Sequence, residues 1–374
     1  MRILYVTDAL AVWGGIERVL SDKMNYLVRE NGYEVYVVTA DQGKHPIPFP
    51  LDERIHVNDL NICFHQQYQY SGLKRVLKYR KLEQLFRIRL KSYITVIKPD
   101  VISCIRDGYA SAVLSMKISI PVIFESHAMY RDVVFENSTL MHRFITYWKR
   151  RKLRNLDRLV ALTQGDANDW KQVCNNVCVL PNVVHLNESG NYSLCNAKKA
   201  IFAGRFDVQK DFGTMLKIWA LVQQRHPEWI LNVYGNGELK PKFEELVAER
   251  KLNVIIHPAV PDVMDRYKES SMLLMSSLYE PFGLVLVEAM SCGLPVVAFD
   301  CPYGPGDIIT DGMDGFLVED RNIEGFANRV CQLMEDEHLR QRMGKAAILS
   351  AQRYNAETIM PQWERLFTHL SNKK

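Results

Sequence analysis

The segment from 280 to 299 constrains the fold of this 374-residue chain more than any other. A short apolar run at 272–277 precedes it, as is typical of a strand buried on both faces. Pro281 and Gly283 predict a tight turn, and a helix is expected over about 284–292 before the next apolar strand. The segment therefore predicts a strand–turn–helix–strand unit of a parallel α/β sheet.

Two glutamates flank the turn of this unit, Glu280 before it and Glu288 inside the helix. The first turn of a helix leaves backbone N–H groups unpartnered, here at about 282–285, and the positive helix end suits a phosphate. Side chains lean toward the helix N-terminus, so both carboxylates can lie beside one anion site. Carboxylates accept hydrogen bonds from sugar hydroxyls, and a nucleotide sugar contains both a phosphate and sugars.

A plainer interpretation of the two glutamates is that Glu280 caps the helix and Glu288 is a solvated helical residue. The residues around Glu288, from Leu284 to Met290, are otherwise apolar and leave no evident polar face. A carboxylate in a mostly buried helix needs a partner, which favours a binding role.

The spacing from Glu280 to Glu288 resembles the E-x7-E signature of retaining glycosyltransferases of family 4. The resemblance implies an α/β chain of the GT-B fold, in which two Rossmann-like, doubly wound domains face a central cleft. It predicts an acceptor-binding domain at 1–190, joined by a C-terminal helix at 356–374, and a nucleotide-sugar-binding domain at 191–355. Polar, turn-rich residues just before position 191 agree with that boundary.

Arg205 and Lys210 follow a predicted strand of the second domain and precede a helix. They match the Gly-Arg…Lys element of the family, whose cations hold the donor diphosphate. An arginine supplies a planar fork and a lysine a compact charge, so the pair can neutralise a dianion. Asp211 stands where the family often has glycine, which leaves the shape of this loop open.

Two elements of the first domain also match the family. Gly14 and Gly15 lie at a strand-to-helix turn, where glycine lets backbone approach a ligand closely. His127 lies at the end of a predicted strand that begins at Pro121, and the resemblance implies that it contacts the transferred sugar. A lone histidine is otherwise more often structural.

Carried over position by position, the resemblance implies two groups of site residues. The catalytic residues are Glu280, His127, Arg205 and Lys210, and the donor-binding residues are Gly14, Gly15, Arg205, Lys210, Val260, Phe282, Gly283, Leu284, Val285 and Glu288. Val260 would lie beside the nucleobase, and a UDP-sugar is favoured as donor. The chain has no D-x-D motif, so no metal is expected, and no cofactor is expected besides the nucleoside-diphosphate sugar.

Composition restricts the compartment. The eight cysteines contain no C-x-x-C pair, and free thiols in a reducing cytosol are expected. The N-terminus runs directly into a predicted strand without a signal peptide, and no apolar run reaches transmembrane length. We therefore expect a cytoplasmic protein.

Basic residues concentrate near 73–97 and 141–158, although the net charge is only +4. A solvated helix face explains either cluster, but aromatic residues beside the second are typical of an interfacial helix. Contact with the anionic inner face of the plasma membrane is predicted, since each basic residue contributes about 1 kcal/mol there. Nucleic-acid binding is not expected, because no recognised module accompanies the charge.

The predicted function is transfer of a hexose or N-acetylhexosamine from a nucleoside-diphosphate sugar to a glycan or lipid-linked acceptor in surface polysaccharide biosynthesis. One alternative is a GT-B epimerase or phosphorylase. The other is a non-catalytic protein that binds nucleotide sugars or glycolipids.

Overall fold

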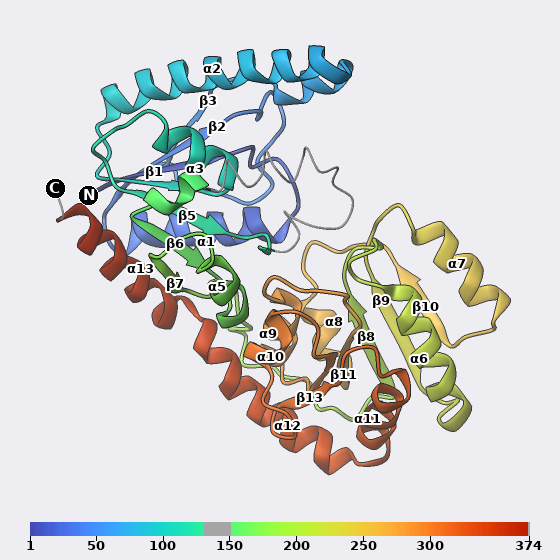
Figure 1. Ribbon diagram of the computed structural model, residues 1–374. Helices are drawn as coiled ribbons and strands as arrows, with labels where there is room; N and C mark the ends of the chain where they lie inside the picture. Colours follow the sequence, from blue (N-terminus) through green and yellow to red (C-terminus); the bar gives the residue numbers. More distant parts are fainter. Residues whose placement is uncertain (131–150, 373–374) are drawn as a thin grey trace. The chain divides into compact units, whose positions relative to one another are not determined.

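The computed structural model describes residues 1–130 and 151–372. The chain divides into two compact units, Met1–Val183 with Ile359–Lys374, and Val184–Thr358, which we call the first and second domains (Figure 1). The boundary predicted from the sequence lies between 190 and 191. Each domain is built on one sheet in which every pair of neighbouring strands is parallel.

The first domain contains a 7-stranded sheet in the order β3-β2-β1-β4-β5-β6-β7. Its strands are β1 (Arg2–Thr7), β2 (Glu34–Thr39), β3 (His56–Asp59), β4 (Val101–Cys104), β5 (Val122–Ser126), β6 (Arg158–Ala161) and β7 (Val177–Val179). Its described helices are α1 (Gly15–Arg29), α2 (Gly72–Ile97), α3 (Asp107–Leu114) and α5 (Gln164–Trp170), with short 3₁₀ turns η1 (Phe64–Gln69) and η2 (Leu153–Asn155).

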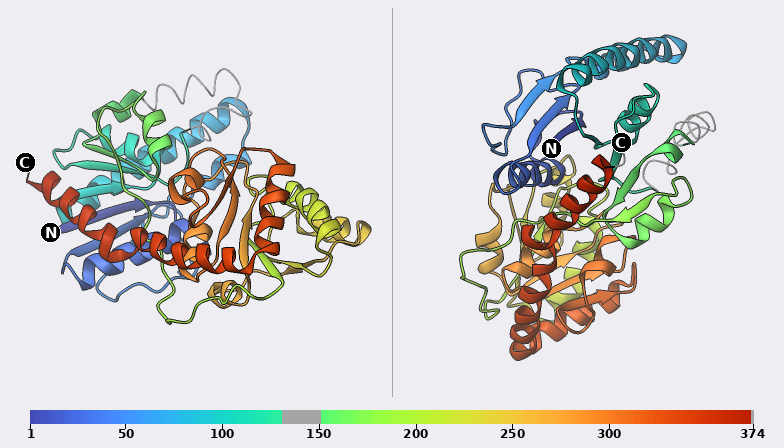
Figure 2. Two further views of the ribbon diagram at one scale, coloured as in Figure 1. Left: turned by 90° about the horizontal axis from the view of Figure 1, so that it is seen from below. Right: turned by 90° about the vertical axis from the view of Figure 1, so that its left-hand side faces the viewer.

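Helices cover both faces of this sheet. Alternate strand residues point to opposite faces, so Leu4 and Val6 of β1 pack in one core with α2 and α3. Tyr5 points the other way, toward α1 and α13. There the ammonium of Lys23 on α1 lies 3.7 Å from the centroid of the Trp363 ring on α13. Figure 2 shows α13 running beside this part of the first domain.

Helix α2 is longer than the sequence predicts. Apolar residues recur at steps of three and four from Tyr79 to Ile97, which predicts a helix that starts at Tyr79, but the helix begins at Gly72. Its core face is formed by Leu82, Phe86, Leu90 and Ile94, all buried. The added residues are mostly exposed, so their apolar side chains Leu73, Val76 and Leu77 lie outside the buried face, although they recur at steps of three and four.

The second domain contains a 6-stranded sheet in the order β10-β9-β8-β11-β12-β13. Its strands are β8 (Lys199–Ala203), β9 (Ile230–Tyr234), β10 (Val254–His257), β11 (Met272–Met275), β12 (Val296–Phe299) and β13 (Gly315–Val318). Its helices are α6 (Phe212–Arg225), α7 (Lys240–Glu249), α8 (Met264–Lys268), α9 (Leu284–Ser291), α10 (Gly304–Ile308), α11 (Ile323–Glu335) and α12 (Glu337–Ala351), followed by η3 (Gln352–Tyr354).

The C-terminal helix α13 (Ala356–Ser371) begins in the second domain, and from Ile359 onward it belongs to the first. The apolar side chains Met360, Trp363 and Phe367 recur at steps of three and four and are buried. None of the helices within residues 1–130 and 151–372 is both long and apolar enough to cross a membrane.

Helices α9 and α12 of the second domain pack with almost no space between their backbones. Gly344 of α12 lies against the turn that ends α9, where a Cβ atom would come 2.2 Å from the carbonyl oxygen of Gly293. Gly293 itself has a φ of +85°, a left-handed conformation that favours glycine and lets the chain turn at the end of α9. The contact fixes how α9, the helix of the E-x7-E segment, sits on its sheet.

We predict that Gly344→Ala lowers the free energy of unfolding by about 2 kcal/mol or more, because overpacking outweighs the preference of a helix for alanine. The control Lys345→Ala changes an exposed neighbour on the same helix and should stay within about 0.5 kcal/mol of the wild type. Urea denaturation of both variants measures the difference. A Gly344→Ala protein as stable as the wild type would contradict the close packing.

Candidate active site

In both sheets the strand order reverses once, and such a switch point creates a crevice at the carboxyl ends of two strands. The reversal lies between β1 and β4 in the first domain and between β8 and β11 in the second. Open α/β sheets bind ligands at this position because the two loops diverge there. The residues predicted from the sequence follow these strands or their neighbours.

In the second domain, Lys210 and Glu280 form an ion pair, with the ammonium nitrogen 2.5 Å from Glu280 Oε2. The hydroxyl of Ser277 donates to the same oxygen at 3.2 Å. Glu280 is 7% exposed, and its backbone bonds to Pro302 and Gly304 on the following loop. The carboxylate is therefore held in one orientation at the carboxyl end of β11.

The N-terminus of α9 begins beside this ion pair. Gly283 caps the helix with a φ of +107°, a conformation that favours glycine. The side chain of Phe282 is buried, with its ring centroid 5.3 Å from that of Tyr354. Leu284 and Val285 form the first helical turn and are partly exposed. The positive end of the α9 dipole lies at these two residues, where an anion site is predicted from the sequence.

Glu288 lies on α9 and is 8% exposed. Its neighbours Val287 and Ala289 are fully buried, so the plainer interpretation of a solvated glutamate is wrong. A buried carboxylate requires a partner, and Glu288 is engaged by other groups of the structure.

Arg205 follows β8 and has an exposed side chain. Its guanidinium lies 3.1 Å from Asp207 Oδ2 and 3.4 Å from the amide oxygen of Gln209. Gln209 in turn donates to the carbonyl of Tyr279, at 3.2 Å, and so connects this loop to the residue before Glu280. The structure thus brings the loop of Arg205 and Lys210 against the E-x7-E segment.

The loop ends at Asp211, whose φ is +42°. Asp211 caps α6 by accepting a hydrogen bond from the N–H of Thr214 at 3.3 Å, and its other oxygen lies 2.9 Å from Arg321. Arg321 also donates to the carbonyl of Ser277, at 2.6 Å. The sequence analysis missed Arg321, because nothing near it in the chain indicates that its partner lies far upstream.

Val260 lies in the loop that follows β10, and it is partly exposed. Its neighbour Ala259 donates its backbone N–H to the side-chain oxygen of Asn236 at 3.3 Å, which ties this loop to the end of β9. The apolar side chain of Val260 can offer only van der Waals contact to a ligand, and its assignment to the nucleobase remains a prediction.

In the first domain, a pocket of about 190 Å³ opens at the switch point between β1 and β4. Gly14 caps α1 at its edge, and a Cβ there would lie 2.4 Å from a carboxylate oxygen of Glu17. Gly15 is the first residue of that helix and is exposed. The pocket is lined by Thr7, Asp8, Ala9, Val12, Ile16, Glu17, Ile105, Arg106, Asp107, Phe124, His127, Ala128 and Trp170.

The charged groups of this pocket contact one another. Asp8 pairs with Arg106 and accepts a hydrogen bond from the hydroxyl of Tyr109. Burial raises the pKa of Glu17, although the positive charge of Arg106 opposes the shift. The pocket thus offers carboxylates and one guanidinium to a polar ligand.

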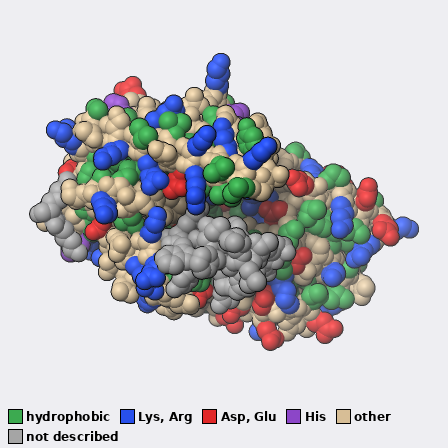
Figure 3. Space-filling model, turned by 45° about the horizontal axis from the view of Figure 1, so that its top comes forward, with side chains coloured by type: hydrophobic (Ala, Val, Ile, Leu, Met, Phe, Trp, Pro, Cys, Tyr) green, Lys and Arg blue, Asp and Glu red, His purple; other side chains and the backbone are tan. Residues whose placement is uncertain are grey.

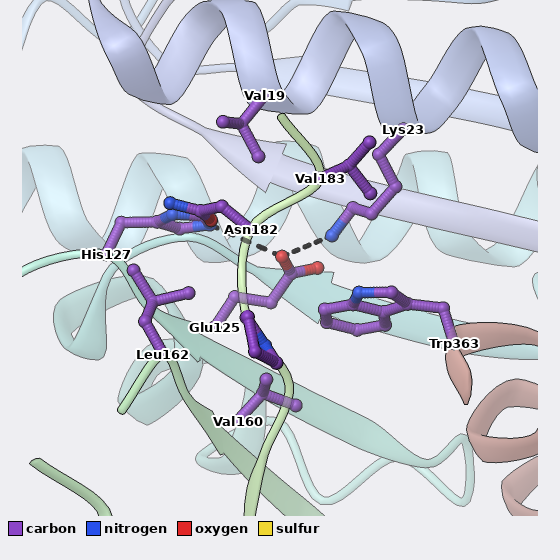
Figure 4. Close-up of a pocket in the computed structure, with 10 residues that line it drawn as sticks. Val19, Lys23, Glu125, His127, Val160, Leu162, Asn182, Val183 and Trp363 are labelled. Carbon is purple, nitrogen blue, oxygen red and sulfur yellow. Dashed lines mark hydrogen bonds and ion pairs between the residues drawn. The ribbon is translucent and has the colours of Figure 1, made fainter. Parts of the chain in front are cut away.

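His127 lines the pocket, and beneath it lies a buried network that Figure 4 shows. Glu125 Oε2 accepts from the ammonium of Lys23 and lies 3.3 Å from His127 Nε2, while Ser103 donates to Oε1 at 2.6 Å. Burial alone raises the pKa of Glu125, but the charge of Lys23 and the bonds from His127 and Lys23 together lower it to about 2. Glu125 is therefore an ionised carboxylate at neutral pH.

Metal-ligating side chains do not gather in the part of the chain that the structure describes: no group of three or more His, Cys, Asp or Glu residues there could hold a metal ion. All eight cysteines are free. Burial raises the pKa of several of their thiols, Cys292 and Cys301 each to about 12, so these two are unreactive core residues.

The second predicted basic cluster lies partly outside the described residues, which do not include 141–150.

Two protein-family profiles match consecutive parts of the chain. Glycosyltransferase Family 4 matches residues 13–188, and Glycosyl transferases group 1 matches residues 194–350. The two matches correspond closely to the two domains.

Relatives match over nearly the full length. An uncharacterized glycosyltransferase of Haemophilus influenzae is 27% identical over 361 residues, covering 94% of this chain and 95% of its own. The amylovoran biosynthesis glycosyltransferase AmsD of Erwinia amylovora is 27% identical over 376 residues, covering 97% of this chain and 98% of its own.

Solved structures share the fold at low identity. A mutant of S. aureus TarM, in complex with fondaparinux, α-GlcNAc-glycerol and UDP, superposes with a TM-score of 0.79 at 16% identity, covering 98% of this chain and 99% of that one. The pneumococcal O-GlcNAc transferase GtfA, in complex with UDP and GlcNAc, gives a TM-score of 0.76 at 13% identity, covering 98% and 99%.

We predict that Asp211→Ala lowers the free energy of unfolding by about 2 kcal/mol, because it removes a helix cap and leaves a left-handed conformation to alanine. Asp211→Gly accepts that conformation and should lose only about 1 kcal/mol. Asp211→Asn keeps the cap and should stay closest to the wild type. Thermal unfolding of the three variants gives the ranking, and equal losses for alanine and glycine would contradict a role for the backbone conformation.

Proposed function

The chain belongs to glycosyltransferase family 4, and from this we propose that it moves a hexose or N-acetylhexosamine from a UDP-sugar to an acceptor hydroxyl. Its two parallel α/β domains are those of the GT-B fold. The family retains the configuration of the transferred sugar. The finer parts of the proposal concern the donor, the acceptor and the roles of individual residues.

The ion pair between Lys210 and Glu280 at the start of α9 carries the proposal. It combines a cation, a sugar-binding carboxylate and the positive end of a helix within one short segment of the second domain. A donor diphosphate at this helix end would be met by Lys210, by Arg205 and by backbone N–H groups. The same groups would stabilise the charge that develops on the diphosphate as it departs.

The remaining site residues divide between the two sugars of the donor. We assign Glu288 to the ribose hydroxyls, Glu280 to hydroxyls of the transferred sugar, and His127 of the first domain to that same sugar.

The other site residues are assigned to the phosphates and the base. Gly14 and Gly15 would let backbone approach the phosphates, and Val260 would lie beside the base. Backbone groups rather than side chains would recognise the base.

The proposed chemical step keeps the anomeric configuration by a front-side route. The acceptor oxygen bonds to the anomeric carbon on the face from which the nucleoside diphosphate leaves. The acceptor proton passes to the departing phosphate oxygen, so atoms and charges balance without a protein nucleophile. Glu280 is held by Lys210 and by its backbone bonds, which suits a group that binds hydroxyls.

Relatives support both the proposed acceptor and the proposed donor. The relative AmsD is a glycosyltransferase of amylovoran biosynthesis and matches 97% of this chain, which supports a glycan or lipid-linked acceptor of surface polysaccharide assembly. TarM and GtfA are solved with UDP, which supports a uridine donor.

Helix α2 supports a further part of the proposal, contact with the inner face of the plasma membrane. Leu73, Val76 and Leu77 are 75%, 45% and 51% exposed at its start. Basic residues alternate with them, and Figure 3 shows Lys and Arg side chains spread among apolar ones over the face that carries α2. Apolar and basic side chains together on one helix are typical of an interfacial helix. Such contact would place the enzyme at the cytoplasmic leaflet.

We predict that a UDP-sugar binds and that Lys210→Met or Arg205→Ala weakens binding about 10- to 100-fold, because each removes a charged bond to phosphate. Lys217→Ala removes an exposed cation of the same domain and should bind normally. Calorimetry with a panel of UDP- and GDP-sugars measures the binding of each variant.

Nucleotide release that depends on an acceptor hydroxyl identifies a transferase, whereas an epimerised donor or a sugar phosphate identifies the alternatives. A protein that binds no donor in the panel contradicts the proposal.

We predict that the protein pellets with vesicles that contain anionic lipid at low salt. Replacing Lys74, Arg80 and Lys81 by glutamine should weaken pelleting about 100-fold, since each cation contributes about 1 kcal/mol. The matched control replaces Lys242, Arg250 and Lys251 of the second domain, which are equally exposed. Equal pelleting with neutral and anionic vesicles would remove membrane contact from the proposal without affecting donor binding.

A further inference from the structure

We propose that Lys23, Ser103 and Glu125 are positioning residues that fix the ring of His127, and that Trp363 of the C-terminal helix completes their arrangement. The inference rests on the proposed role of His127 at the transferred sugar. It assigns a function to buried charged groups that the proposed reaction does not otherwise use.

The network is too enclosed to touch a substrate. The side chains of Lys23 and Glu125 are each 2% exposed. The cavity beside them measures only about 10 Å³, which is close to the minimum for a single water molecule, whereas the pocket beyond His127 measures about 190 Å³. His127 lines the small cavity, as Figure 4 shows, and it also lines the larger pocket, so it lies between the network and that pocket. Glu125 therefore acts through His127 and cannot be a nucleophile.

The hydrogen bonds place a proton on Nε2 of the histidine ring, and in the neutral ring they select one tautomer. Glu125 is an ionised carboxylate, and it accepts from Lys23 and from Ser103 and has no proton to give. His127 Nε2, 3.3 Å from Glu125 Oε2, must then be the donor. A neutral ring that carries its proton on Nε2 leaves Nδ1 as the nitrogen available to a hydroxyl of the substrate.

Lys23 makes the buried carboxylate possible, and Trp363 stabilises Lys23. An unpaired carboxylate at this depth would take up a proton and become a donor toward His127. The ammonium of Lys23 prevents this, and it lies 3.7 Å from the centroid of the Trp363 ring, within cation–π range. Residues of α1, β4, β5 and α13 thus converge on one histidine.

Two double variants separate positioning from stability. In Lys23→Met with Glu125→Leu, both charges and the acceptor are lost, and apolar replacement of a buried ion pair is often neutral or stabilising. In Lys23→Met with Glu125→Gln, the charges are lost but a carbonyl oxygen can still accept from Nε2. The two proteins differ in the acceptor for His127 while sharing the loss of charge.

The first measurement requires no substrate. Nitrogen NMR of the neutral His127 ring, assigned by its loss in His127→Gln, should show a proton on Nε2 in the wild type. The leucine double variant should show a mixture of both tautomers, and the glutamine double variant should recover the Nε2–H form. A wild-type ring protonated on Nδ1, or an unchanged tautomer in the leucine variant, overturns the inference.

The second measurement is turnover. The leucine double variant should lose about 10- to 100-fold in kcat with KM for the donor within about 2-fold, as for residues that orient a ligand through another, and the glutamine variant should regain part of the loss. Ser103→Ala, a mild change, should show a smaller effect in the same direction. A leucine variant as active as the glutamine variant means that the network is only structural.

The control for a general loss of a buried carboxylate is Asp314→Asn in the second domain. Asp314 is fully buried and accepts a hydrogen bond from Ser350 at 2.6 Å. This variant should alter stability without altering the His127 tautomer. If the protein binds no nucleotide sugar, the proposed function fails while the NMR result still stands, so the two failures can be told apart.

Discussion

The structure depends on a single constraint: two parallel sheets are covered by helices on both faces. Strands such as β4, β11 and β12 are buried along their whole length, so a polar side chain can reach solvent only where a strand ends. The chemistry of both domains consequently lies at carboxyl ends of strands, His127 after β5, Arg205 after β8 and Glu280 after β11. The loops can differ widely because the sheets, not the loops, provide the rigid frame.

Each domain contains a similar lysine–glutamate pair, the first between α1 and β5 and the second between the loops that follow β8 and β11. Lys23 with Glu125, and Lys210 with Glu280, are lysine–glutamate pairs whose carboxylate also accepts from a serine, Ser103 or Ser277. The side chains of the first pair are each 2% exposed, whereas those of the second are 12% and 9% exposed. Removing two charges from water costs free energy, so a fully buried ion pair adds little stability. Its side chains nevertheless keep one arrangement. The more open pair keeps a cation that a ligand can reach.

Features formed by residues that lie close together in the chain could be predicted from the sequence. The strand–turn–helix unit, with its tight turn at Pro281 and Gly283, and the burial of Glu288 follow from residues within one segment. The network around Glu125 could not be predicted in this way, because Lys23 appears in the sequence as an ordinary helix cation. Its partner lies 102 residues away, and only the parallel register of β1, β4 and β5 brings the two together. The early start of α2 was missed although Leu73, Val76 and Leu77 recur at steps of three and four, because these side chains are exposed and do not belong to the buried face that begins near Tyr79.

Backbone strain in the second domain lies beside the groups that the proposed reaction uses. Asp211 and Tyr303 have φ values of +42° and +123°, and aspartate tolerates the left-handed region while tyrosine rarely enters positive φ. Such a residue persists only where its surroundings hold it.

Hydrogen bonds on either side of Tyr303 hold its loop to Glu280. Pro302 accepts the N–H of Glu280, and Gly304 donates to the carbonyl of Glu280. A Cβ at Gly304 would lie 1.7 Å from the carbonyl oxygen of Phe282, so this loop packs directly against the turn before α9 and has no room for a larger residue. The strained loop and the E-x7-E turn are therefore one rigid unit, which fixes the Glu280 carboxylate before any substrate arrives.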